Sequence, residues 1–288
     1  MSDSIYDSRP QLHPVLEPYQ RYSFPFDPHM YPEDFIGQYH SCPVRLPSGW
    51  PTTVSITRYQ SGATTETIAE KLRLVKKIRE HHGDALPPAL KDWLKTTRPT
   101  AVFAGHGLPE EVSLVCEQAM LCGHIPVALL REWAHRWIGL DCNGFVCFYF
   151  LKLGTLSRVV HKHPRYAEIS RVARSVAEVD IDSVLLWTKS GDNKHFKVKV
   201  NPQEDGAHIA VVDTWHEHGS SLLVAERGGE RRFTGHVGIH CGVYDIVAAP
   251  KAGCSDDEAV WRVRSREPIR DKEAKVEKVF ITRRMQAY

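Results

Sequence analysis

The chain has 288 residues, of which 42% are hydrophobic and 25% charged, and its formal net charge is +2. This length and apolar content suffice for one large domain, or for one domain with a substantial extension. Basic residues alternate with acidic ones and form no run of five or six like charges, so the sequence does not favour nucleic acid as a partner.

The first twenty residues, MSDSIYDSRPQLHPVLEPYQ, do not resemble a secretory signal, because they lack a basic segment followed by about 7–15 apolar residues. No window approaches the ~20 apolar residues of a membrane span. We therefore expect synthesis in the cytoplasm without a signal peptide, and no membrane span. Seven cysteines at irregular spacing, an odd number, predict reduced thiols rather than a disulfide framework.

Residues 1–60 are rich in proline, tyrosine and aspartate, which predicts an extension without regular elements that packs on the rest of the chain. Residues 61–128 are expected to form a helical region that caps or precedes a catalytic domain. A helix is predicted over 64–81, with Thr64 as its cap and Gly83 as its stop. Its apolar residues recur at helical spacing, at Ile68, Leu72, Val75 and Ile78. Shorter helices are expected at 87–95, 109–122 and 126–138.

Residues 129–288 form the predicted catalytic domain, in which the hydrophobic period changes. A helix is expected at 164–178. Short β-rich runs, each bounded by Gly, Asp, Asn or Ser, follow at 183–187, 195–200, 208–215, 221–226, 236–247 and 260–265. Helices followed by a run of strands predict an α+β fold with an antiparallel sheet.

The stretch GLDCNGFVCFYFLKLG places Cys142 at the start of a buried helix that ends at Gly154. Asp141 is suited to accept hydrogen bonds from the first free amides of this helix. A thiol in the first turn feels the positive end of the helix dipole, which is expected to lower its pKa and favour the nucleophilic thiolate. Gly144 leaves space for a substrate beside the sulfur. Cys147, one turn further along, lacks these features and represents the alternative, a thiol that only packs.

Two histidines are candidates for the base that such a thiol needs. If Trp215 pairs with Gly219 across a hairpin loop, antiparallel register sets His208 opposite Glu226, with both side chains on one face of the sheet. A carboxylate there would orient the imidazole. A shift of one residue would separate the pair. His236, in TGHVGIHCG, also opens a strand, and the spacing leaves both histidines open.

The segment GLDCNGFV resembles the Asp-Cys-(Ser/Asn)-Gly-Phe-Val motif of the NlpC-type and CHAP-type peptidases and amidases, members of the papain-like superfamily that cut peptide bonds in bacterial cell walls. The similarity continues in order through IDSVLLW, HIAVVD and LLVAE, over residues 130–265. It implies a papain-like domain in which a helical layer, with the catalytic cysteine at a helix start, packs on an antiparallel sheet. It also implies that Cys142 is the nucleophile, His208 the base and Glu226 the third polar residue.

The function that this resemblance implies is hydrolysis of amide bonds in peptidoglycan peptides, as an endopeptidase or amidase. A chain without a signal would then be an effector exported by a dedicated secretion system or a phage lysis route, with a cognate inhibitor protein as partner. The alternatives are an intracellular protease, deamidase, transglutaminase or acyltransferase of the same superfamily, and a catalytically dead binding module.

No cofactor or metal is predicted for this chain. The histidines of HEH at 216–218, with His236, His240 and Cys241, lack the spacing of a zinc site. Glycine-rich phosphate-binding motifs are absent from the sequence.

Overall fold

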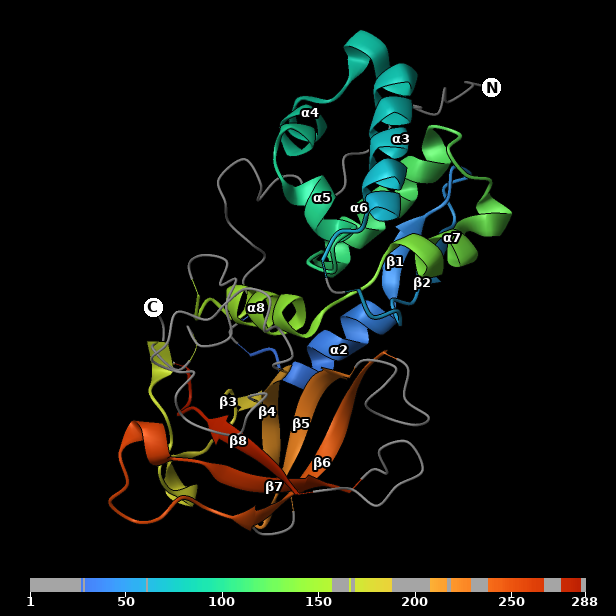
Figure 1. Cartoon of the computed structure of the whole chain (residues 1–288). Coiled ribbons are helices and arrows are strands. Elements are labelled where there is room, and N and C mark those ends of the chain that lie inside the picture. The colour runs from blue at the N-terminus through green and yellow to red at the C-terminus, as the bar shows by residue number, and fades with distance from the viewer. Residues whose placement is uncertain are drawn as a thin grey trace.

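The computed structural model describes residues 27, 29–60, 62–156, 166, 169–187, 208–216, 219–228, 238–266 and 276–285. One half of the molecule is built from the helices α3 to α7 and the other from a β-barrel (Figure 1). Helices α2 (Pro32–His40) and α8 (Cys142–Lys152) lie between the two halves and contact barrel strands. The junction between the halves is where the candidate site is found.

The barrel contains six strands, closed in the order β3, β4, β5, β6, β7, β8. Their bounds are β3 Val184–Trp187, β4 His208–His216, β5 Ser221–Gly228, β6 Gly238–Ala248, β7 Trp261–Ser265 and β8 Glu277–Ile281. Every neighbouring pair is antiparallel, and β8 pairs with both β3 and β7. The expected papain-like arrangement, a helical layer packed on an open sheet, is therefore wrong. Strand β8, which the sequence analysis did not predict, closes the sheet and removes its free edges.

The described part of residues 1–60 also differs from the expected extension without regular elements. It contains α2 and a two-stranded antiparallel sheet, β1 (Cys42–Arg45) and β2 (Pro51–Val54). Proline is compatible with these elements because Pro32 stands in the first turn of α2, where a backbone N–H has no partner within the helix. Phe35 and Tyr39 of α2 are fully buried, so this segment is part of the core.

The helical half agrees closely with the expected helices. Its elements are α3 Thr65–His82, η1 Gly83–Ala85, α4 Pro88–Lys95, α5 Arg98–Val102, α6 Pro109–Leu121, η2 Val127–Leu129 and α7 Leu130–Trp137. The Thr64 hydroxyl accepts a hydrogen bond from the Thr67 amide at 3.2 Å, and Gly83 ends α3 with a φ of +51°. In the described chain, no helix has both the length and the apolar character that a membrane crossing requires.

Two elements expected within residues 129–288 differ from the structure or lie outside its described residues. The helix expected over 164–178 is wrong from residue 171 onward, because Val172 forms an isolated bridge with Thr282 and only a short turn, η3 (Val176–Glu178), follows. The strand expected at 195–200 lies outside the described residues. A further short turn, η5 (Asp256–Glu258), precedes β7.

Alternation along β4 divides the apolar residues between two cores. Ile209 and Val211 pack in the larger core, which contains α8. Ala210 and Val212 pack inside the barrel. Since side chains of a strand point alternately to opposite faces, the outer wall of β4 supports α8 while its inner wall fills the barrel.

Candidate active site

Helix α8 begins at Cys142, and Asp141 is its N-cap. Asp141 has an extended backbone, and its Oδ1 accepts a hydrogen bond from the Gly144 amide. Gly154, with a φ of +75°, follows the end of the helix. The helix is buried on all sides, as expected for the run of aromatic residues after Cys142. The predicted cap and the predicted position of the cysteine in the first turn are therefore correct.

The Cys142 thiol is more basic than its place at a helix start suggests. Burial and the negative charge of Asp141 raise its pKa to about 12, against the amides of Ile209, Asn143 and Cys142, which act to lower it. Only 7% of the residue is exposed. The helix dipole therefore does not decide its ionisation, and the expectation of a lowered pKa is wrong. At neutral pH the thiol is protonated and needs a base to react.

The structure brings His208 and Glu226 together, in a register that differs from the expected one. His216 pairs with Ser221 at the hairpin, and Ala210 pairs with Glu226. A β-bulge between Val212 and Thr214 separates these two registers. Without the bulge, Glu226 would pair with Val211 and point away from His208. With the bulge, the partner of Glu226 is Ala210, two positions along β4 from the expected partner, His208. The side chains of His208 and Glu226 therefore stay on one face of the sheet.

The ring of His208 contacts Glu226 and Trp187 at this end of the barrel, and Glu226 in turn contacts Tyr244 and His240. His208 Nε2 lies 2.7 Å from Oε2 of Glu226, whose side chain is completely buried. The Tyr244 hydroxyl donates to Oε1 of Glu226 at 2.6 Å. The indole of Trp187 lies 4.9 Å from the His208 ring, and His240 Nε2 lies 3.9 Å from Glu226 Oε1. The sequence did not single out Tyr244 or Trp187.

Cys142 approaches this cluster from the outer side of β4. The Ile209 amide lies near the Cys142 thiol and acts to lower its pKa, and His208 is the residue before Ile209. His208 pairs with Trp187 and shares the inner face with Ala210, whereas Ile209 faces the core that contains α8. Cys142 and His208 are therefore neighbours along the strand, on the two sides of its first residues.

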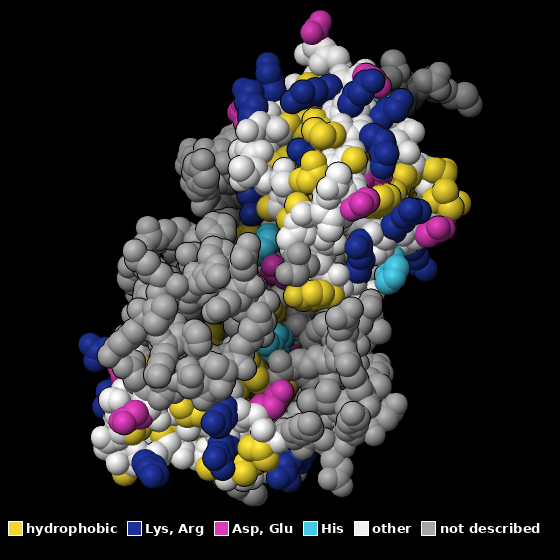
Figure 2. Space-filling model, in the orientation of Figure 1, with side chains coloured by type: hydrophobic (Ala, Val, Ile, Leu, Met, Phe, Trp, Pro, Cys, Tyr) yellow, Lys and Arg dark blue, Asp and Glu magenta, His cyan; other side chains and the backbone are white. Residues whose placement is uncertain are grey.

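A second histidine, which the sequence analysis did not consider, lies at the start of α8. His106 Nε2 is 2.8 Å from Oδ2 of Asp141, and its side chain is 25% exposed. The Asp141 amide donates to the Gly105 carbonyl at 3.0 Å. Because this contact joins segments distant in sequence, nothing in local spacing predicts it. In Figure 2, histidine and acidic side chains reach the surface at the junction between the helical half and the barrel.

Other expected candidates fall outside the described chain or form no site. His236 and the glutamate and second histidine of HEH lie outside the described residues. Within the described ranges, no group of three or more His, Cys, Asp or Glu side chains is placed to hold a metal ion.

Comparison with protein-family models, with curated proteins and with solved structures gave no match for this chain.

Proposed function

We propose that the protein is a cysteine-dependent hydrolase of amide bonds, with Cys142 as nucleophile, His208 as base and Glu226 as the residue that orients His208. The observation that carries the proposal is the 2.7 Å pair of His208 and Glu226, next to the strand amide that contacts the Cys142 thiol. A thiol, an imidazole and a buried carboxylate supply the three chemical roles of this class of enzyme.

The first step is proton transfer and attack. His208 Nε2 faces Glu226, so Nδ1 is the nitrogen assigned to receive the Cys142 proton. The sulfur then forms a bond to the carbonyl carbon of the substrate, and the amide C–N bond breaks as His208 returns the proton to the leaving amine. Cys142 and His208 lie on the two sides of the first residues of β4, so the proposed mechanism requires the imidazole to reach the thiol around the start of this strand when substrate binds.

Hydrolysis of the thioester completes the cycle. Water gives a proton to His208 and its oxygen attacks the acyl carbon, which releases the acid and restores the Cys142 thiol. Throughout, Glu226 accepts the hydrogen bond from Nε2 and fixes the tautomer, while the Tyr244 hydroxyl fixes the carboxylate. Burial of this carboxylate makes its orientation strongly dependent on these two donors.

The substrate class proposed is a peptidoglycan peptide, cut within the stem or at the amide joining it to the sugar. This part rests on the resemblance of GLDCNGFV and HIAVVD to cell-wall hydrolases. The same resemblance supports an exported effector with a cognate inhibitor as its partner.

One observation favours a second candidate, a binding module with an inert thiol. Cys142 is buried, and its pKa of about 12 leaves almost no thiolate at neutral pH. In this candidate the Asp141 and Glu226 networks only stabilise the fold.

The test is digestion of purified peptidoglycan, with release of soluble peptides followed by mass spectrometry. Wild type and Cys147→Ala should release peptides, and Cys142→Ala should release none. Cys147→Ala is the matched control because Cys147 lies in the same helix and is also buried. Equal digestion by wild type and Cys142→Ala would refute the assignment of Cys142 as the nucleophile.

If the wild-type protein leaves peptidoglycan intact, the proposal that peptidoglycan peptides are its substrate is wrong. If its Cys142 nevertheless reacts in a His208-dependent way, a different amide is the substrate and the intracellular alternatives become the ones to pursue.

A further inference from the structure

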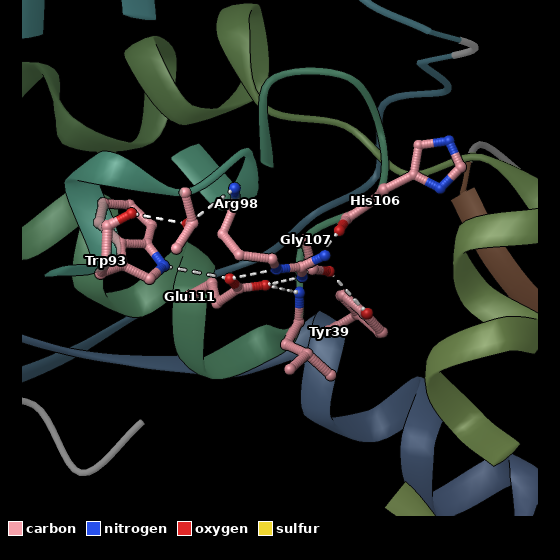
Figure 3. A network of polar contacts seen from close by, with 8 residues as sticks. Tyr39, Trp93, Arg98, His106, Gly107 and Glu111 are labelled. Atoms are coloured by element: carbon pink, nitrogen blue, oxygen red, sulfur yellow. Dashed lines mark hydrogen bonds and ion pairs between the residues drawn. The ribbon is translucent and has the colours of Figure 1, made fainter. Parts of the chain in front are cut away.

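The loop that carries His106 is fixed from several directions. Arg98 donates to the His106 carbonyl at 3.1 Å and forms an ion pair with the buried carboxylate of Glu111. The Tyr39 hydroxyl donates to the Gly107 carbonyl at 2.8 Å. Figure 3 shows these contacts converging on the backbone of the loop, with the His106 ring turned away from them. The backbone is therefore held without using the histidine side chain.

The ring is placed over the first turn of α8. A Cβ atom built on Gly144 would lie 3.2 Å from His106 Nδ1 and would overlap the Gly105 carbonyl oxygen. Nε2 is the nitrogen that faces Asp141. Nδ1 thus faces the backbone of Gly144, two residues after the proposed nucleophile.

We propose that His106 is a catalytic residue that donates a hydrogen bond from Nδ1 to the carbonyl oxygen of the amide attacked by Cys142. The inference rests on the proposed function and deepens it. The helical half then supplies one wall of the active site and is more than a cap or delivery region.

The chemistry follows from the two ring nitrogens. In the doubly protonated imidazole, Nε2–H donates to Asp141 while Nδ1–H donates to the substrate oxygen. As the sulfur attacks, the carbonyl oxygen becomes an oxyanion, and a fixed donor stabilises this charge more than the neutral ground state. Asp141 acts as a positioning residue for the ring as well as a helix cap.

The experiment compares two reagents at Cys142. Acetylation by p-nitrophenyl acetate passes through an oxyanion: the sulfur bonds to the acetyl carbon, the proton passes to His208 and nitrophenolate leaves. Alkylation by iodoacetamide displaces iodide and forms no oxyanion. Both need the same thiolate, so the ratio of their rates is independent of how much thiolate is present.

In His106→Gln, the ratio of acetylation to alkylation at Cys142 should fall by ~10²–10³, as for loss of one oxyanion donor. His124→Gln is the matched control, because His124 Nε2 also bonds a carboxylate, at 2.7 Å from Glu70, but within the helical half. Its ratio should not change. His106→Ala, which retains the backbone contacts of the loop, provides a second variant if glutamine disturbs it.

An unchanged ratio in both folded His106 variants would overturn the inference and leave His106 as a structural partner of Asp141. If Cys142 of the wild type reacts no faster than Cys147 with either reagent, the proposed function itself fails and this inference fails with it.

Discussion

Replacement of Asp141 by asparagine tests why the Cys142 thiol is protonated at rest. The charge of Asp141 is the second cause, after burial, that raises the pKa of Cys142 to about 12. Asparagine removes this charge but keeps a side-chain oxygen for the Gly144 amide, and it is as good a helix cap as aspartate. The variant should therefore fold and carry a thiol of lower pKa.

The magnitude follows from the interaction of adjacent charges. For two unit charges about 5 Å apart, Coulomb's law gives ~3 kcal/mol at an effective dielectric constant of ~20 and ~0.8 kcal/mol at ~80. These energies correspond to a pKa decrease of about 0.6–2 units. Because the thiolate is the reactive form, Cys142 alkylation at a fixed pH well below its pKa should accelerate roughly 4- to 100-fold.

The assay is alkylation by iodoacetamide, followed cysteine by cysteine with peptide mass spectrometry. Asp213→Asn is the matched control: Asp213 is also buried and accepts an amide hydrogen bond at a helix start, from Glu33 at 2.9 Å. Asp213 raises the pKa of Cys241 rather than that of Cys142, and it is the second cause of this shift after burial of the Cys241 thiol. Asp141→Asn should accelerate only Cys142, and Asp213→Asn only Cys241. A Cys142 rate that does not respond to Asp141→Asn would refute the electrostatic reasoning.

Three further predictions concern the barrel and the turn before β3. Tyr244→Phe removes a donor to the buried Glu226 carboxylate, so the free energy of unfolding should fall by ~1.5–3 kcal/mol in urea denaturation; a change below about 0.5 kcal/mol would contradict this. A double-mutant cycle of His208→Gln and Glu226→Gln should give a coupling of ~0.5–3 kcal/mol, whereas additive effects would mean no interaction. Burial raises the pKa of Asp182. The contribution of this carboxyl group to the stability of the fold is therefore fully present below its pKa in the unfolded chain, and it is lost as the pH rises through its pKa in the folded protein. Asp182→Asn should therefore stabilise the protein more at pH 7 than at pH 4, and an equal effect at both would contradict the sign.

Local signals predicted the helices of the helical half and the position of Cys142 in the first turn of α8 well. Thr64 and Asp141 are caps because side-chain oxygens satisfy the first amides of a helix, and this requires only neighbouring residues. Gly83 and Gly154 adopt positive φ angles at the helix ends for an equally local reason. Such features depend on a few consecutive residues, which is why the sequence predicts them.

The features that the sequence did not predict depend on contacts between distant segments. Closure of the barrel rests on β8, a five-residue strand whose partners β3 and β7 are set by the whole sheet. The register that unites His208 with Glu226 depends on a bulge at Asp213, whose carboxylate caps α2. His106 reaches Asp141 only because the helical half folds against α8. His208 and Glu226 therefore lie together as predicted, but in a strand register that their spacing in the sequence does not predict.

The most direct test of the central claim is the pH profile of Cys142 alkylation by iodoacetamide in wild type and His208→Gln. If His208 removes the thiol proton, the wild-type rate should level off in the range where histidines titrate, about pH 6–8. His208→Gln should lose this plateau and rise about tenfold per pH unit toward the thiol pKa of about 12. Identical profiles in the two proteins, with Cys142 as slow as Cys147, would contradict the assignment of Cys142 and His208 as nucleophile and base.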